Sequence, residues 1–397
     1  MCIKIKNQIF FSLIIILFLS FTSCSSQNNS ISVIDNQEVS LNQADANHEY
    51  YPTDTWRTST PEEQGVDSEK LYKLVKGIKE NKTEIDSLII VRNGYIITEA
   101  NFSGDENSIR ALNSCTKSIT STLVGVAIND GYIKNIDMKL LDIYPEMEIK
   151  NNNALKKQIT LKHLLTMSAG FDWNEWSSSY DDLENPAIQL GRSFNTVQFM
   201  LDQSVSSESG KVFNYNSGET HLLSAIYTKL SGKTIAEYAE DKLFKPLGIT
   251  KKYWEIAPDG ITYGGFGLNM RAIDMAKVGY LFLKKGKWVN EQIIPEEWVE
   301  NSTKKHIDAD FYGTSNGYGY QWWINSFGGY SARGLHGQYI IVMPELNMVV
   351  VFQSHFTDND LIPLYMMEIN IMPAVKSPQP IPSNTKISEM LKSICSK

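Results

Sequence analysis

The sequence predicts an α/β protein of the α+β type, in which one antiparallel β-sheet is flanked by helices and carries a helical subdomain. Strand-like segments occur in pairs toward both ends of the apolar part of the chain, and the residues between these pairs have the periodicity of helices. Strands from both ends can form one sheet if the helices between them are an insertion. The crevice between that sheet and the insertion is then the natural place for a binding site.

The first 23 residues have the three-part layout of a secretory signal peptide. Lys4 and Lys6 precede an apolar stretch over 9–21 that is too short for a membrane-spanning helix, and small residues then lead to Cys24. This pattern resembles the lipobox of bacterial lipoproteins, with Phe21 where leucine is more usual. We therefore expect an exported protein that is lipid-anchored through Cys24 to a bacterial membrane and faces the periplasm or the cell exterior. Ordinary signal cleavage, with Cys24 incidental, is the alternative.

Polar segments bound the expected folded part on both sides. Residues 24–55 are rich in Ser, Asn, Gln and Asp and lack a periodic apolar pattern, which indicates a tether. Four prolines fall between 373 and 382. We therefore expect one domain over 56–372, followed by a Pro-rich C-terminal tail over 373–397.

The composition is that of an ordinary globular protein with ample core, since 42% of the 397 residues are hydrophobic and 21% are charged. A formal net charge of -8, without a block of basic residues, gives no support to nucleic-acid binding. Four cysteines imply no disulfide framework. No cluster of His, Cys, Asp and Glu has metal-ligand spacing, so we expect neither a metal nor another cofactor.

The elements of the domain follow from local patterns. Residues 87–100 are two apolar runs around Asn93-Gly94, the strongest short-range signal for a β-hairpin. A second strand pair is predicted at 338–343 and 348–352, on either side of a turn that begins at Pro344. Between these pairs, apolar periodicity predicts helices over 115–130, 160–167, 219–231, 234–243, 271–285 and 295–301.

Ser114 and Lys117 stand at the start of the first of these helices and are the leading candidates for chemistry. Residues three apart on a helix lie one above the other, so a lysine amine at this spacing can take the proton of a serine hydroxyl. The same pattern occurs at 302–305 and 383–386, but only the first is followed by residues that bury one helical face. Taken locally, Ser114 could equally be a helix cap.

Two further segments offer the groups that a lysine base requires. An ordinary lysine is protonated at neutral pH, so burial or neighbouring groups must lower its pKa. Tyr215 precedes the helix predicted over 219–231 and could relay a proton to a leaving group. The glycine-rich segment 334–338 precedes a strand and would let a substrate approach backbone N–H donors.

Taken together and in this order, the motifs resemble the class C beta-lactamase-related serine hydrolases. That family includes low-molecular-mass penicillin-binding proteins, esterases of beta-lactamase type and 6-aminohexanoate-dimer hydrolases. The resemblance runs from about residue 60 to about residue 354 and implies a beta-lactamase/transpeptidase-like fold with acyl-enzyme chemistry. It rests on Ser114-Cys-Thr-Lys117, Leu161-Lys-His-Leu-Leu-Thr-Met-Ser-Ala-Gly170, Phe213-Asn-Tyr-Asn-Ser217, Leu243-Phe-Lys-Pro-Leu-Gly-Ile249, Gly264-Gly-Phe-Gly-Leu268 and Gly334-Leu-His-Gly-Gln338.

The resemblance also implies a role for individual residues. Ser114 would be the nucleophile, Lys117 its base and Tyr215 the proton shuttle. The backbone N–H groups of Ser114 and Gln338 would form the oxyanion hole. The residues expected to contact substrate are Ser217, His336 and Gly337.

Two departures from the family pattern bear on the substrate. Tyr215-Asn-Ser217 replaces the common Tyr-x-Asn and resembles the esterase and 6-aminohexanoate-dimer hydrolase branch. Leu335 stands where a true beta-lactamase has a cationic group that holds the substrate carboxylate, although His336 or Arg333 could substitute. We therefore expect a serine hydrolase that cleaves a small-molecule ester, an amide or a short peptide, with penicillins as poor substrates.

Two alternatives stay open at this point. One is a penicillin-binding D-alanyl-D-alanine carboxypeptidase or a class C-type beta-lactamase. The other is a non-catalytic sensor or binding protein that uses the same fold, because a fold alone does not determine a function.

Other residues have plainer interpretations. Cys115 would point away from Lys117, so we expect a small buried side chain rather than a nucleophile. His163 and His221 are expected on a helix surface or in the core. Trp173 and Trp176 could line a pocket or pack in the core.

Overall fold

The computed structural model describes residues 50–396. The expected signal peptide over 1–23, the expected lipidation of Cys24 and most of the expected tether therefore lie outside the described residues. Within residues 50–396, no helix is long and apolar enough to cross a membrane.

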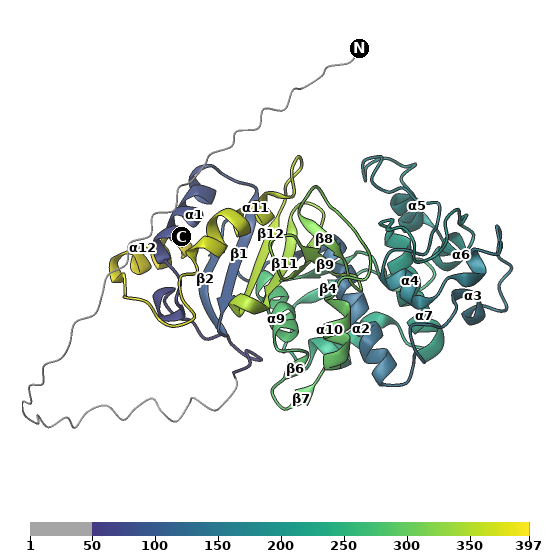
Figure 1. Ribbon diagram of the computed structural model, residues 1–397, viewed down its shortest axis with the longest axis horizontal. Helices are drawn as coiled ribbons and strands as arrows, with labels where there is room; N and C mark the ends of the chain where they lie inside the picture. Colours follow the sequence, from purple (N-terminus) through teal and green to yellow (C-terminus); the bar gives the residue numbers. More distant parts are fainter. Residues whose placement is uncertain (1–49, 397) are drawn as a thin grey trace, which may run out of the picture. The chain divides into compact units, whose positions relative to one another are not determined.

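The central sheet has seven strands, all paired antiparallel, in the order β2-β1-β12-β11-β10-β9-β8 (Figure 1). The N-terminal hairpin joins the C-terminal strands where β1 pairs with β12. This confirms the predicted sheet built from both ends of the domain. The strands are β1 (Ile85–Arg92), β2 (Tyr95–Asn101), β8 (Ser315–Tyr318), β9 (Trp323–Asn325), β10 (Tyr330–Gly334), β11 (Gln338–Met343) and β12 (Met348–Ser354).

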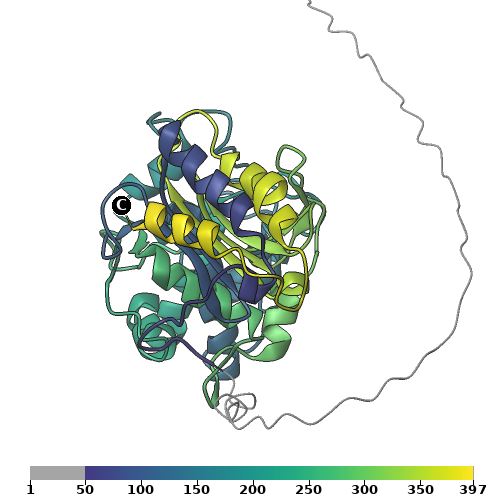
Figure 2. The same ribbon diagram turned by 90° about the vertical axis from the view of Figure 1, so that its left-hand side faces the viewer.

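Both faces of the sheet are buried, because successive side chains of each strand enter different cores. In β1, Leu88 and Ile90 pack in one cluster, whereas Ile89 and Val91 pack in another. The first face is covered by α1 (Ser68–Glu80), α11 (Ile362–Met366) and α12 (Thr385–Cys395), which stand in front of the strands in Figure 2. On the second face, α9 (Ala272–Leu283) contacts β11 and β12.

The Pro-rich C-terminal segment belongs to this fold, so the expected tail over 373–397 is wrong. The guanidinium of Arg92 in β1 donates to the carbonyl oxygen of Ser377 at 2.9 Å, and the Ile381 N–H donates to the carbonyl oxygen of Glu62 at 2.9 Å. Helix α12 then packs along α1 and β2, and its Leu391 is only 3% exposed. The physical reason is that α12 is amphipathic and buries its apolar face on α1.

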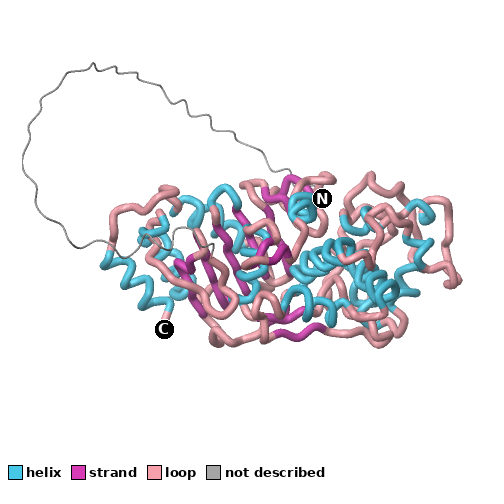
Figure 3. Tube along the Cα trace, turned by 90° about the horizontal axis from the view of Figure 1, so that it is seen from below, coloured by secondary structure: helices cyan, strands magenta, loops and turns pink. Residues whose placement is uncertain are grey.

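The six helices predicted between the strand pairs all have counterparts. Figures 1 and 3 show the strands with helices on both sides, and α3 to α7 at the end of the molecule away from α1 and α12. The helices are α2 (Thr116–Asn129), α3 (Leu140–Ile143), α4 (Leu161–Leu165), α5 (Pro186–Arg192), α6 (Thr196–Leu201), α7 (Ser217–Ser231), α8 (Ile235–Ala239) with a following π-helical turn (Glu240–Phe244), α9, and α10 (Glu296–Ser302). Two small sheets pair β3 (Arg110–Ala111) and β4 (Lys252–Trp254) with β5 (Leu268–Met270), and β6 (Lys287–Trp288) with β7 (Glu291–Gln292).

Helix α2 lies where the sheet meets the helical region. It contacts α7 and α8 of that region, α10, and β10 of the central sheet. Every residue from 116 to 127 is buried, which explains why the helix, apart from Lys117, is apolar or has small side chains on all sides. The N-terminus of α2 therefore opens at the junction where the sequence predicted a site.

Candidate active site

Ser114 lies in a short 3₁₀ turn (Asn113–Cys115) that leads into α2. Asn113 has φ of 47°, a left-handed conformation that asparagine tolerates better than most residues, and its side-chain amide donates to the carbonyl oxygen of Leu335 at 2.8 Å. No side chain caps the start of α2. The hydroxyl oxygen of Ser114 instead lies 3.0 Å from Nζ of Lys117, so the helix-cap interpretation does not describe this serine.

Lys117 is only 1% exposed and its amine contacts three oxygens. These are Oγ of Ser114 at 3.0 Å, Oγ of Ser217 at 2.9 Å and the carbonyl oxygen of Gly265 at 2.8 Å. Burial lowers the pKa of Lys117 to about 8, and the negative charge of Glu175 acts in the opposite direction. Lys117 is therefore able to lose its proton near neutral pH and to accept one from Ser114.

Tyr215 lies two residues before α7, next to Asn216, whose side chain caps the helix. Its ring stacks on Trp176 with centroids 4.9 Å apart, and Nζ of Lys117 lies 4.9 Å from the same ring. Burial holds the pKa of Tyr215 well above its usual range, whereas a hydrogen bond with Ser114 lowers it slightly. Tyr215 is consequently a neutral phenol beside Ser114, able to donate its hydroxyl proton.

Glu175 is a site residue that sequence reasoning missed. It is 1% exposed, and one carboxylate oxygen accepts from the Ser217 N–H at 2.8 Å while the other accepts from the Ser217 hydroxyl at 2.8 Å. The Trp173 indole N–H and the Tyr180 hydroxyl also donate to it, at 2.6 Å and 2.9 Å. Glu175 lies in an irregular loop without periodicity, so only the folded structure brings it to Ser217.

A cavity of about 220 Å³ opens at Ser114. Half of its lining residues are aromatic, and Trp176 is one of them, whereas Trp173 is buried and donates to Glu175. Such walls suit an apolar or flat acyl group. The lining residues are Ser114, Glu175, Trp176, Ser178, Tyr180, Tyr215, Phe311, Tyr312, Trp323, Arg333, Gly334, Leu335, Tyr339 and Asp360.

The end of β10, rather than the start of β11, forms the edge of the cavity beside Ser114. Gly334 and Leu335 line the cavity, and a Cβ on Gly334 would lie 2.3 Å from the carbonyl oxygen of Leu112. Only glycine allows this close approach of the strand to the turn that holds Ser114. The backbone N–H groups at Ser114 and Leu335 are therefore the candidates for an oxyanion hole.

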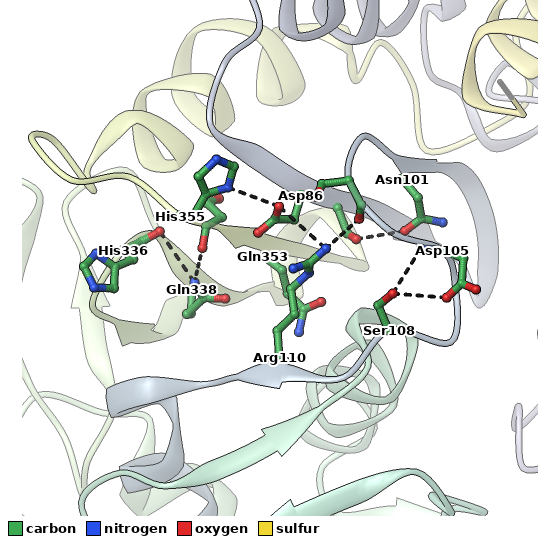
Figure 4. Close-up of polar contacts among 12 residues, drawn as sticks. Asp86, Asn101, Asp105, Ser108, Arg110, His336, Gln338, Gln353 and His355 are labelled. Atoms are coloured by element: carbon green, nitrogen blue, oxygen red, sulfur yellow. Dashed lines mark hydrogen bonds and ion pairs between the residues drawn. The ribbon is translucent and has the colours of Figure 1, made fainter.

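Gln338, which we expected to supply that second donor, does not line the cavity. Gln338 pairs with Gly334 across the hairpin, and its side-chain amide donates to the carbonyl oxygen of Ser354. Figure 4 shows its side chain turned toward the C-terminal end of β12. The sequence has glycines at both 334 and 337, and it is Gly334, packed on Leu112, that lies next to the nucleophile.

His336 and Gly337 also lie outside the lining of the cavity, contrary to the expectation that they contact substrate. Nδ1 of His336 lies 2.7 Å from the carbonyl oxygen of Phe356, and a Cβ on Gly337 would meet the Phe356 ring at 2.8 Å. Both residues have positive φ in the tight turn from β10 to β11, and both lie against Phe356, which follows β12. Ser217, also expected to contact substrate, does not line the cavity either, and its hydroxyl contacts Lys117 instead.

Cys115, His163 and His221 are engaged in packing, hydrogen bonding or helix capping. Cys115 is fully buried, its thiol donates to the carbonyl oxygen of Gln338 at 3.2 Å, and burial raises its pKa far above the usual range. His163 completes the capping box of α4, and buried His221 contacts Thr196. Among residues 50–396, no group of three His, Cys, Asp or Glu side chains could hold a metal ion.

Comparison with known proteins gives consistent results. The family model described as Beta-lactamase matches residues 74–361. The 6-aminohexanoate-dimer hydrolase of Paenarthrobacter ureafaciens is 24% identical over 331 residues, which cover 76% of this chain and 81% of the relative. The lovastatin esterase of Penicillium rubens is 27% identical over 158 residues, 35% of this chain and 38% of the relative. The octameric penicillin-binding protein homologue from Pyrococcus abyssi superposes with a TM-score of 0.61 at 21% identity, covering 78% of each chain.

Proposed function

The chain belongs to the beta-lactamase family, as its motifs predicted, and on that premise we propose that it is a serine hydrolase that cleaves a small ester or amide through an acyl-enzyme. The observation that carries the proposal is the contact between the amine of buried Lys117 and the hydroxyl of Ser114 at 3.0 Å. A lysine with a pKa near 8 is available as a base, and the serine is then an activated nucleophile.

Acylation follows from the positions of four groups. The neutral amine of Lys117 takes the proton of Ser114, whose oxygen attacks the substrate carbonyl carbon and forms a tetrahedral intermediate. The N–H groups of Ser114 and Leu335 are placed to donate to the resulting oxyanion. Tyr215 gives its hydroxyl proton to the departing alcohol or amine and recovers one from protonated Lys117, so that the acyl group remains on Ser114.

Deacylation uses the same groups in the reverse order. A water molecule in the position of the leaving group loses a proton toward Tyr215 and Lys117 while its oxygen attacks the acyl carbon. When the tetrahedral intermediate collapses, Ser114 recovers its proton and the acid product leaves. The high pKa of Tyr215 fits this use as a relay, because the phenol is protonated at the start of each step.

The cavity favours small esters and amides with apolar acyl groups over penicillins. Leu335 offers no charge, and the guanidinium of Arg333 is already bound to Ser331, Thr314 and Asn325 by four hydrogen bonds of 2.8 to 2.9 Å. Within residues 50–396, no other cationic side chain lines the cavity to bind a penicillin carboxylate. The names of two relatives support this substrate class, because one is a hydrolase of an amide and the other is an esterase.

Steady-state hydrolysis tests the proposal. We expect kcat/KM for a short p-nitrophenyl ester to exceed that for nitrocefin, and Ser114→Ala to abolish turnover without loss of the folded state. Efficient nitrocefin turnover would favour the beta-lactamase alternative. Retained esterase activity in folded Ser114→Ala protein would exclude the proposed nucleophile, and a wild-type protein that turns over neither substrate would favour the non-catalytic alternative.

The expected lipid anchor is a separate proposal about the cellular location. It is supported by the pattern of basic, apolar and small residues that ends at Cys24. Expression in a bacterial host with labelled fatty acid tests it, because the full-length protein should carry the label and the Cys24→Ser variant should not. An unlabelled wild-type protein that is cleaved and secreted would favour ordinary signal cleavage.

A further inference from the structure

Glu175 is connected to the catalytic base through one hydroxyl group. Ser217 stands between them, with Oγ 2.8 Å from a carboxylate oxygen of Glu175 and 2.9 Å from Nζ of Lys117. All four groups that contact Glu175 can donate, and two of them are N–H groups that can do nothing else. The side chain is therefore surrounded as a carboxylate acceptor.

This arrangement fixes the direction of the hydrogen bonds around Lys117. Since the carboxylate accepts, Ser217 must give its single hydroxyl proton to Glu175, and its oxygen is left to accept from Lys117. The carbonyl oxygen of Gly265, at 2.8 Å, can also only accept. A neutral amine has two protons and one lone pair. The two protons are used by Ser217 and Gly265, and the lone pair is left for the hydroxyl of Ser114.

We propose that Glu175 is a positioning residue for the acyl transfer: by holding the Ser217 hydroxyl, it directs the lone pair of neutral Lys117 at Ser114. The inference rests on the proposed function, since it assigns to Glu175 the orientation of that same base. Without the carboxylate, the Ser217 hydroxyl is free to turn and donate to the lone pair of Lys117. Ser217 then competes with the nucleophile for the base.

Glu175 also acts on Lys117 through its charge. The ionisable groups that influence the amine are Glu175 from the loop before α5 and Cys115 from the turn before α2, and the ring of Tyr215 covers it. Glu175 is the larger of the two influences that raise the pKa of Lys117 against the effect of burial. Removal of the negative charge should therefore lower the pKa of Lys117 while it misdirects the lone pair.

The rate at which a fluorophosphonate modifies Ser114 measures this effect without a known substrate. We would follow the intact mass of the wild type and of Glu175→Gln from pH 6 to pH 10. The amide of Glu175→Gln has the size of the carboxylate but can donate to Ser217, which reverses the direction of that hydrogen bond. We expect the limiting rate to fall at least about tenfold and the pH midpoint to move to lower pH by about half a unit.

Glu219→Gln is the matched control. Glu219 is also a fully buried carboxyl group next to the site, but the structure records no contact of its side chain with Ser217 or Lys117. A midpoint and rate close to wild type in Glu219→Gln, together with both changes in Glu175→Gln, support the inference. The same changes in both variants would instead indicate a general response to loss of a buried carboxyl group and would overturn it.

A double-mutant cycle with Ser217→Ala separates positioning from packing. If Glu175 acts through Ser217, Glu175→Gln should cost much less in rate when the Ser217 hydroxyl is already absent. Fully additive losses would overturn the inference, as would a folded Glu175→Gln protein that reacts like wild type. If Glu175→Gln does not fold, Glu175→Asp takes its place. We then expect a reduced rate of fluorophosphonate modification with an unchanged pH midpoint. A modification rate equal to that of the wild type would contradict the inference. A wild type that is not modified at all refutes the proposed function itself, and the inference with it.

Discussion

Gly334→Ala is expected to disable the enzyme without unfolding it. The added Cβ would lie 2.3 Å from the carbonyl oxygen of Leu112 and 3.2 Å from the backbone nitrogen of Cys115. A carbon and a carbonyl oxygen need about 3.3 Å, so the end of β10 must retreat by about 1 Å from the turn that holds Ser114. The N–H of Leu335, one residue further on, would retreat with it.

A misplacement of about 1 Å costs on the order of 10²-fold in rate when it separates catalytic groups. We therefore expect kcat for a p-nitrophenyl ester to fall about 100-fold in Gly334→Ala. Overpacking should cost about 1–3 kcal/mol of stability, which leaves the protein folded at 25 °C. The assay is steady-state kinetics combined with thermal unfolding followed by circular dichroism.

Gly77→Ala is the control for this experiment, because a Cβ at Gly77 meets no atom within 4 Å and the residue lies in α1, far from the cavity in sequence. It should retain wild-type kinetics. Wild-type kcat in Gly334→Ala would refute the assignment of the end of β10 to the oxyanion hole. A protein that loses activity only because it unfolds would show the loss in the circular dichroism signal as well.

Three further predictions follow from the buried groups of the structure. The neutral amine of Lys117 is the proposed base, and burial lowers its pKa to about 8, so kcat/KM for the ester should rise with pH through about 8. A flat profile of kcat/KM from pH 6 to pH 9 would contradict this role. Burial raises the pKa of Glu219 well above its usual range, so the native state keeps its proton while the unfolded state loses it above about pH 4.3. Wild-type stability should therefore decline as pH rises from 4 to 8, and Glu219→Gln, which cannot ionise, should raise Tm increasingly over that range. Equal Tm values for the two proteins at every pH would contradict this account. Leu391→Ala should lower the free energy of unfolding in urea by about 2–4 kcal/mol, since the Leu391 side chain is buried and only 3% exposed. A loss below about 0.5 kcal/mol, the size expected of a surface substitution, would show that α12 contributes little to stability.

The sequence was sufficient to predict contacts between residues that are close together along the chain. Ser114 and Lys117 are three residues apart, and a helix brings any such pair together, so their contact at 3.0 Å could be expected from periodicity alone. The β-hairpin at Asn93-Gly94 is likewise a property of adjacent residues. The role of Tyr215 came from the resemblance to a family, because nothing local shows that a residue two positions before α7 lies beside Lys117 of α2.

Long-range contacts account for what was missed. Glu175 lies in an irregular loop and contacts Ser217 only because α7 carries Ser217 to it. The second oxyanion donor was expected at Gln338, whereas Leu335 lines the cavity, because two glycines three residues apart fit the motif equally well and only the packing of Gly334 on Leu112 distinguishes them. The prolines before α12 indicated an irregular tail. The apolar face of α12 is buried only because α1 packs beside it.

Helix α1 was overlooked although its signals are local. Asp67 caps its N-terminus by accepting from the N–H groups of Glu69 and Lys70, and Leu71, Leu74, Val75 and Ile78 form one buried face. A cap followed by this apolar periodicity is enough to predict the helix from the sequence. The spacing of these residues is sufficient to predict a helix, whereas no spacing in the sequence predicts the contact between Glu175 and Ser217.

The measurement that tests the central claim most directly is the site of covalent modification. The protein without its first 24 residues would be incubated with a fluorophosphonate, digested, and its peptides sequenced by mass spectrometry. We predict a single adduct, on Ser114, that is absent from Ser114→Ala and slowed in Lys117→Ala. Modification of another residue, or of none in a folded protein, would contradict the proposal that Ser114 and Lys117 form an activated nucleophile.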